Sequence, residues 1–93
     1  AEAAKPEWWN DEGLKALSER VVRAAPNEAS ANLMRAMVLG LMSYAWEVGP
    51  RSAAELNEAA THFERAAALC DAPVGKAHFA RMAVISRSQA EAV

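Results

Sequence analysis

Prolines divide this chain of 93 residues into segments of helix length, because they stand at Pro6, Pro26, Pro50 and Pro73. Proline lacks the amide hydrogen that a helix interior requires and restricts the residue before it, so it is typical of helix boundaries. The segments are rich in alanine (23 residues), whereas only nine residues of the chain are β-branched. This composition favours helices over strands. We therefore predict an all-α fold of about four antiparallel helices in a single domain, residues 1–93.

Apolar residues recur at spacings of three and four within each segment, as on one face of a helix. Start signals support the assignment: Asn10 can cap a helix, and Ser52 followed by Glu55 forms a capping box. The predicted helices span residues 10–25, 28–48, 52–71 and 74–92, after an N-terminal extension of residues 1–9. Connections this short predict that consecutive helices pack antiparallel.

The second predicted helix, residues 28–48, is apolar over nearly its whole circumference. Such a helix is either the most buried element of a small domain or is covered by a partner. Its methionines, Met34, Met37 and Met42, fit an adaptable binding surface or simple filling of the core.

Charge and composition exclude several classes of protein. The net charge is −2, without a basic segment, which argues against nucleic-acid binding. The chain also lacks an apolar run of about 20 residues, so we expect a soluble protein with no membrane span. One cysteine, Cys70, cannot form an internal disulfide, which favours the cytoplasm or a reducing organelle interior. An N-terminal Ala1 fits either removal of an initiator methionine or cleavage of a targeting segment.

The residues capable of catalysis or metal binding form no recognisable constellation. Cys70 with His62 or His78 is the only combination of thiol and imidazole, and it has no local signature. Glu58 and His62 share one helix face but supply two metal ligands, whereas zinc sites use three or four. We expect a solvated Glu58–His62 pair, Cys70 in the core, and neither enzyme activity, metal nor cofactor.

The middle of the chain resembles a tetratricopeptide (TPR) repeat. Residues 25–29, Ala-Pro-Asn-Glu-Ala, are similar to the junction between two such repeats. Arg35-Ala36 matches a residue pair of the family's first helix, and Ala59, Phe63 and Ala66 match the pattern of its second helix. The resemblance implies a TPR-like helical hairpin array. The spacing from Ala36 to Ala59 is about ten residues longer than the repeat's period allows, so we expect extended helices around residues 44–52.

TPR modules bind peptides or helices in a groove lined by the first helix of each repeat. In this chain the resemblance implies that the groove is formed by Ser30, Leu33, Met37, Gly40 and Leu41. Some TPR modules clamp a C-terminal carboxylate with lysine and asparagine, but Leu33 and Met37 stand at those places. An apolar groove instead predicts a hydrophobic helix or segment as the partner, or burial by Trp8 and Trp9 of the chain itself.

These patterns predict a protein–protein interaction or scaffold module, a small subunit of a larger complex. Tryptophan is common at interface hot spots, and two adjacent tryptophans cannot both face one small core. The predicted partner-binding residues are Trp8, Trp9, Leu33, Met37, Leu41 and Tyr44. The alternative is a small helical protein that binds a ligand or pigment in a pocket lined by its second helix.

Overall fold

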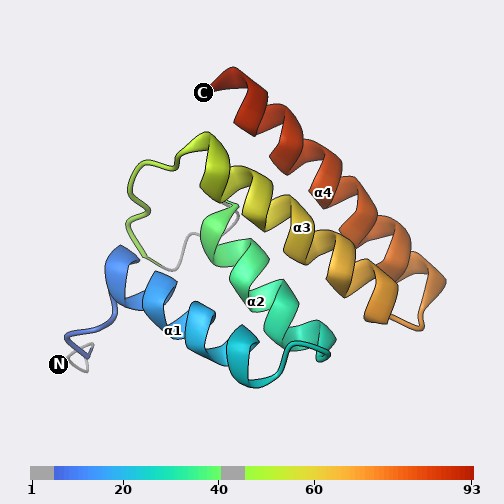
Figure 1. Cartoon of the computed structure of the whole chain (residues 1–93), viewed down its shortest axis with the longest axis horizontal. Helices are drawn as coiled ribbons and strands as arrows, with labels where there is room; N and C mark the ends of the chain where they lie inside the picture. The colour runs from blue at the N-terminus through green and yellow to red at the C-terminus, as the bar shows by residue number, and fades with distance from the viewer. Residues whose placement is uncertain (1–5, 41–45) are drawn as a thin grey trace, which may run out of the picture.

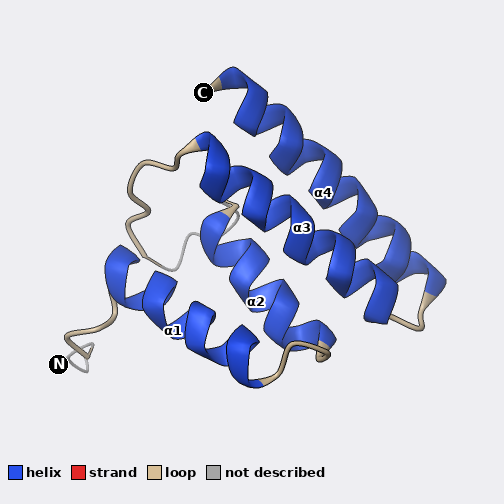
Figure 2. Ribbon diagram, viewed as in Figure 1, coloured by secondary structure: helices blue, strands red, loops and turns tan. Residues whose placement is uncertain are grey.

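The computed structural model describes residues 6–40 and 46–93. It contains four α-helices, and the described residues form no strand (Figures 1 and 2). The helices are α1 (Asp11–Ala24), α2 (Ala29–Leu39), α3 (Ala53–Leu69) and α4 (Pro73–Ala92). The prediction of an all-α fold with about four helices is therefore confirmed.

The helices follow one another as antiparallel hairpins. Each helix reverses the direction of the one before it, and helix packing joins α1 to α2, α2 to α3 and α3 to α4 (Figure 1). The chain is thus a helical hairpin array, as predicted. In such an array α2 and α3 have helical neighbours on two sides, whereas α1 and α4 form the ends.

Side-chain caps set two of the helix starts within one residue of the predicted positions. The Asn10 side chain accepts a hydrogen bond from the amide of Gly13, at 2.9 Å, at the start of α1. Ser52 and Glu55 form a reciprocal capping box at the start of α3. The helix α4 begins at Pro73, because proline suits the first helical turn, where its missing amide hydrogen is not needed.

The second helix is shorter than the predicted range of 28–48. It ends at Leu39, and residues 46–52 are not helical, so the expected extension around residues 44–52 is wrong for the described part of that range. The end of α2 at Leu39 is explained by a tertiary hydrogen bond to the last turn of this helix. The buried Arg51 side chain donates to the carbonyl oxygen of Val38 at 2.9 Å, which a continuing helix would use for its own amide hydrogen.

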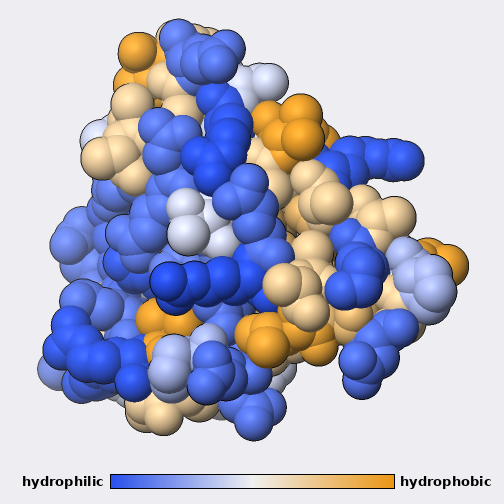
Figure 3. Space-filling view, turned by 45° about the vertical axis from the view of Figure 1, so that its right-hand side comes forward, coloured by the Kyte–Doolittle hydropathy of each residue, from blue (hydrophilic) through white to orange (hydrophobic). Residues whose placement is uncertain are grey.

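Alanine supplies most of the core. Ala36, Ala60 and Ala83 surround Phe63, with the partly buried Leu33 and Met82 packed against them. Ala59 and Ala66 of α3 are also fully buried. Small side chains let three helices approach closely around α3, but they bury little apolar area each. Other large apolar residues, such as Leu69, Val74, Val84 and Ile85, are exposed, and Figure 3 shows apolar side chains as separate patches among charged ones.

A buried arginine strengthens this thin core by joining three helices. Arg35 of α2 donates to the carboxylate of Glu58 on α3 at 2.9 Å. It also donates to the Lys15 carbonyl and the Ser18 hydroxyl of α1, at 2.8 and 3.1 Å. The Glu58 carboxylate balances the charge of the guanidinium, and the Lys15 carbonyl and the Ser18 hydroxyl accept its other hydrogen bonds. The buried arginine is therefore not left as an unpaired charge between the helices.

Enlarging a core alanine should destabilise the fold. We expect Ala60→Leu to lower the free energy of unfolding by about 1–3 kcal/mol, because Ala60 has no exposed surface and an added side chain must displace its neighbours. Ala68→Leu on the same helix is the control, since Ala68 is exposed. Urea denaturation followed by circular dichroism measures both. Equal stability of the two variants would show that the alanine core is not tightly packed.

Candidate partner-binding site

The segment that carries Trp8 and Trp9 is folded back against the start of α1. The amide of Trp9 donates to the Pro6 carbonyl at 2.9 Å, and the amide of Asn10 donates to the Trp8 carbonyl at 2.8 Å. The two indoles pack edge to face, with ring centroids 5.8 Å apart. A Cβ atom at Gly13 would overlap the Trp8 carbonyl, so the absence of a side chain there allows this close approach.

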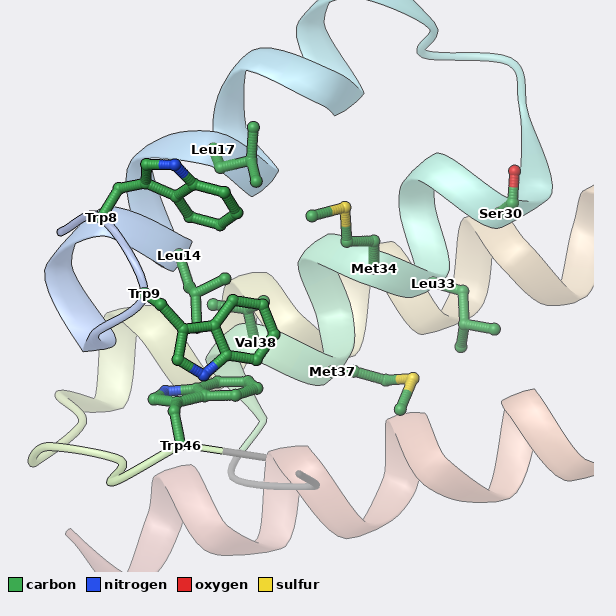
Figure 4. Close-up of a pocket in the computed structure, with 10 residues that line it drawn as sticks. All are labelled: Trp8, Trp9, Leu14, Leu17, Ser30, Leu33, Met34, Met37, Val38 and Trp46. Carbon is green, nitrogen blue, oxygen red and sulfur yellow. The ribbon is translucent and has the colours of Figure 1, made fainter. Parts of the chain in front are cut away.

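An apolar hollow of about 420 Å³ lies between this segment, α1 and α2. We call it the tryptophan hollow. Figure 4 shows Trp9 and Trp46 side by side at one end of it, with Trp8 above Leu14 and next to Leu17. Its lining residues, apolar except for one serine, are Trp8, Trp9, Leu14, Leu17, Ser30, Leu33, Met34, Met37, Val38 and Trp46.

A second hollow of about 250 Å³ lies between α2, α3 and α4. We call it the phenylalanine hollow. It is lined by Leu33, Met37, Phe63, His78, Phe79 and Met82, and so shares two residues with the tryptophan hollow. Leu33 and Met37 therefore form a ridge between the two hollows. Side chains from all four helices thus contribute to one apolar surface.

The structure brings together four of the six residues predicted to bind a partner. Trp8, Trp9, Leu33 and Met37 all line the tryptophan hollow. Trp8 is 49% exposed and Met37 is 38% exposed. The other two predicted residues, Leu41 and Tyr44, lie outside the described residues. The predicted groove residue Gly40 is buried at the end of α2.

Several lining residues were not predicted as part of the site. Met34 could have been found, because it follows Ser30 by four residues and so shares the exposed side of α2. Trp46 falls within the range predicted as the second helix, but it lies on a non-helical segment and forms a wall of the tryptophan hollow. Phe79 and Met82 lie on α4, and only tertiary packing places them beside Leu33.

A buried ion pair positions Trp46. The Asp11 carboxylate accepts two hydrogen bonds from the Arg51 guanidinium, at 2.6 and 2.7 Å, and a third from the Trp46 indole at 3.0 Å. The Arg51 side chain is fully buried. Its hydrogen bonds and charge hold the pKa of the Asp11 carboxyl well below its usual range, so this carboxyl is ionised at neutral pH.

His62 is buried, which corrects the expectation of a solvated Glu58–His62 pair. The reason is Asn32 on α2, whose side-chain oxygen lies 2.9 Å from Nδ1 of His62. The Asn32 amide nitrogen donates to the carbonyls of Pro26 and Glu28, so its oxygen faces the imidazole and Nδ1 carries the hydrogen. Burial lowers the pKa of His62, although Glu58, 3.4 Å from Nε2, opposes the shift.

The groups considered for chemistry are not assembled into a site. Among the described residues, no three His, Cys, Asp or Glu side chains are placed to hold a metal ion. Cys70 is a free thiol that caps the C-terminal end of α3, where it is partly exposed rather than in the core as expected.

No family model, curated protein or solved structure was found that matches this chain. Within residues 6–40 and 46–93, none of the helices has both the length and the apolar character needed to cross a bilayer.

Removing the charge of Asp11 should destabilise the protein and disturb the wall of the tryptophan hollow. We expect Asp11→Asn to lower the free energy of unfolding by about 3 kcal/mol, because the buried Arg51 then lacks its counter-charge. Chemical denaturation measures the loss, and tryptophan emission reports the change around Trp46. Glu12→Gln is the control, because the neighbouring Glu12 is exposed and makes only a long ion pair with Lys15. A loss no larger than that of this control would contradict the role of the pair.

Stability should fall as the pH drops from about 7.5 to 5.5. Because the pKa of His62 is lowered in the folded state, the unfolded chain binds this proton more readily, and protonation therefore favours unfolding below pH about 6.5. We expect His62→Gln to flatten this pH dependence of the free energy of unfolding. His78→Gln should retain it, because His78 is exposed. The same slope in His62→Gln and the unmodified protein would contradict this origin of the pH dependence.

Proposed function

We propose that this chain is a protein–protein interaction module of the TPR-like kind, which binds an apolar segment of a partner protein. The observation that carries the proposal is the tryptophan hollow, which is open to solvent and lined almost entirely by apolar side chains. Large apolar surfaces are costly to leave in water, so such a hollow favours an occupant.

The side chains at the mouth of the hollow suit protein recognition. Trp8 exposes half of its surface, and tryptophans that become buried on association are enriched among interface hot spots. Met37, also exposed, has a flexible thioether that adjusts to the shape of a partner. These two residues are therefore the proposed anchors of the interface.

A thin core is consistent with a role as a small subunit of a larger complex. Much of the buried apolar surface is alanine, while larger apolar side chains remain at the surface. Partner binding would cover this surface and add stability by mass action. The unpaired Cys70 is compatible with a reducing compartment, the cytoplasm or an organelle interior.

A small-molecule ligand is the second candidate for the same hollow. Its volume of about 420 Å³ lies within the range of pockets that hold small ligands, and three tryptophans offer flat apolar walls. A ligand of this kind would be apolar or aromatic, because Ser30 is the only lining residue with a hydroxyl group.

A charge placed at the mouth of the hollow should weaken binding. The probe is a neutral synthetic helix of leucine, alanine and glutamine with one apolar face, titrated against the protein while tryptophan emission is recorded. We expect saturable binding with a blue shift of the emission. Met37→Glu should weaken it about tenfold or more, because the carboxylate would have to lose its water inside an apolar interface.

Leu69→Glu is the matched control, because Leu69 is exposed to the same extent as Met37, 38%, but lies at the end of α3 away from the hollow. This variant should bind the probe normally. Failure of the probe to bind, or equal binding by Met37→Glu, would overturn the proposal. A small molecule retained by the purified protein in native mass spectrometry, and lost in Met37→Glu, would favour the second candidate.

A further inference from the structure

We infer that the partner segment is an apolar helix with opposite charges at its two ends, whose acidic end lies over Arg20 and Arg81. This inference rests on the proposed function and adds the charge and direction of the partner. It comes from the exposed charges that border the two hollows, which differ in sign between the two ends of α2.

The basic border begins on α1. Arg20 follows Leu17 by three residues, so it lies on the side of α1 that faces the tryptophan hollow. The contacts of Arg35 with Lys15 and Ser18 fix the alignment of the antiparallel helices α1 and α2. Because the two helices are antiparallel, Arg20, five residues after Lys15, lies level with about Ser30, five residues before Arg35. Arg20 is therefore next to the N-terminal end of α2.

A second arginine lies at the same level on α4. His78 and Met82 line the phenylalanine hollow, and Arg81 follows His78 by three residues. Contacts between Asn32 and His62, and between Arg87 and Asn57, align α2, α3 and α4 so that Arg81 is level with the N-terminal half of α2. Arg20 and Arg81 therefore border the same end of the apolar surface.

Both arginines are free to meet an acidic partner. Each is exposed, and neither makes an ion pair or hydrogen bond with another described residue. By contrast, four other arginines of the chain are paired with carboxylates; these are Arg23, Arg35, Arg51 and Arg87. Arg65 of α3 is likewise exposed and unpaired among the described residues, but no residue three or four positions from it lines either hollow.

The opposite end of the surface is acidic. Glu47 lines a neighbouring hollow together with Trp9 and Trp46, at the end of the tryptophan hollow near the C-terminus of α2, and Glu7 directly precedes Trp8 in the sequence. Both glutamates are exposed and have no side-chain partner among the described residues. A helix with carboxylates at one end and ammonium groups at the other complements both borders when it lies along α2.

Charges at the border of an interface affect orientation and specificity more than affinity. Each exposed ion pair contributes about 0–1 kcal/mol, so the apolar surface supplies most of the binding free energy. The direction of the bound helix is therefore the property that tests the inference most sharply. The protein provides its own reporter, because all three of its tryptophans, Trp8, Trp9 and Trp46, lie at the acidic end (Figure 4).

The test uses a synthetic helix of about 16 residues, or about 24 Å, with a leucine and alanine face, glutamates at its N-terminus and lysines at its C-terminus. A dansyl group is attached at either end, and energy transfer from the tryptophans is measured at saturation. We expect clearly stronger transfer when the label is on the lysine end. Arg20→Glu/Arg81→Glu should weaken binding about fivefold or more, whereas Arg23→Glu/Arg65→Glu should not, because both of these arginines are exposed and no residue three or four positions from either lines the tryptophan hollow or the phenylalanine hollow.

Equal transfer from the two labelled ends, or binding of Arg20→Glu/Arg81→Glu with unchanged affinity, would overturn the inferred polarity. The proposed function would survive either result, provided that a neutral glutamine-flanked helix still binds and is lost in Met37→Glu. If neither the charged nor the neutral helix binds, the interaction module itself is refuted, and the polarity with it.

Discussion

The ion pair between Asp11 and Arg51 joins three parts of the chain that are far apart in sequence. Asp11 is the first residue of α1, and Arg51 lies directly before Ser52, the N-cap of α3. Arg51 also binds the carbonyl of Val38 in the last turn of α2. Removing a guanidinium from water costs several kcal/mol unless nearly all of its donors find acceptors. This requirement couples the start of α1, the end of α2 and the start of α3 in one arrangement.

That coupling adds polar contacts to a core in which most of the buried apolar residues are alanine. The alanines around Phe63 permit close contact of the helices but contribute little area, and Met37 of α2 is exposed while Leu33 and Met34 are only partly buried. Polar contacts between the helices supply part of the stabilisation that larger buried apolar side chains would otherwise provide. Arg35 binds groups on α1 and α3, and Asn32 binds His62 on α3. The result is a stable framework that leaves the apolar surface of α2 uncovered.

Local signals in the sequence were sufficient for the helices but not for their tertiary partners. Prolines, the Asn10 cap and the Ser52 capping box predicted four helices and most of their starts. The apolar pattern that continued to Val48 could not reveal that Arg51 would bind the last turn of α2. The helical period also predicted that His62 lies on a polar, solvated face. Its burial could not be predicted locally, because its partner Asn32 lies thirty residues earlier in the chain. Trp8 and Met37 could be predicted as binding residues from their residue types. The position of Trp46 in the wall of the hollow depends on its hydrogen bond to Asp11, which the sequence does not reveal.

Polar contacts position two of the tryptophans that line the tryptophan hollow. Trp46 is held by the Asp11 carboxylate, and Trp8 by backbone hydrogen bonds and the absence of a side chain at Gly13. These contacts fix the Trp46 ring and the Trp8 backbone without apolar contacts across the hollow. A preformed apolar surface avoids much of the entropy cost of ordering side chains on association. The same polar contacts that stabilise a small alanine-rich domain therefore also prepare its surface for a partner.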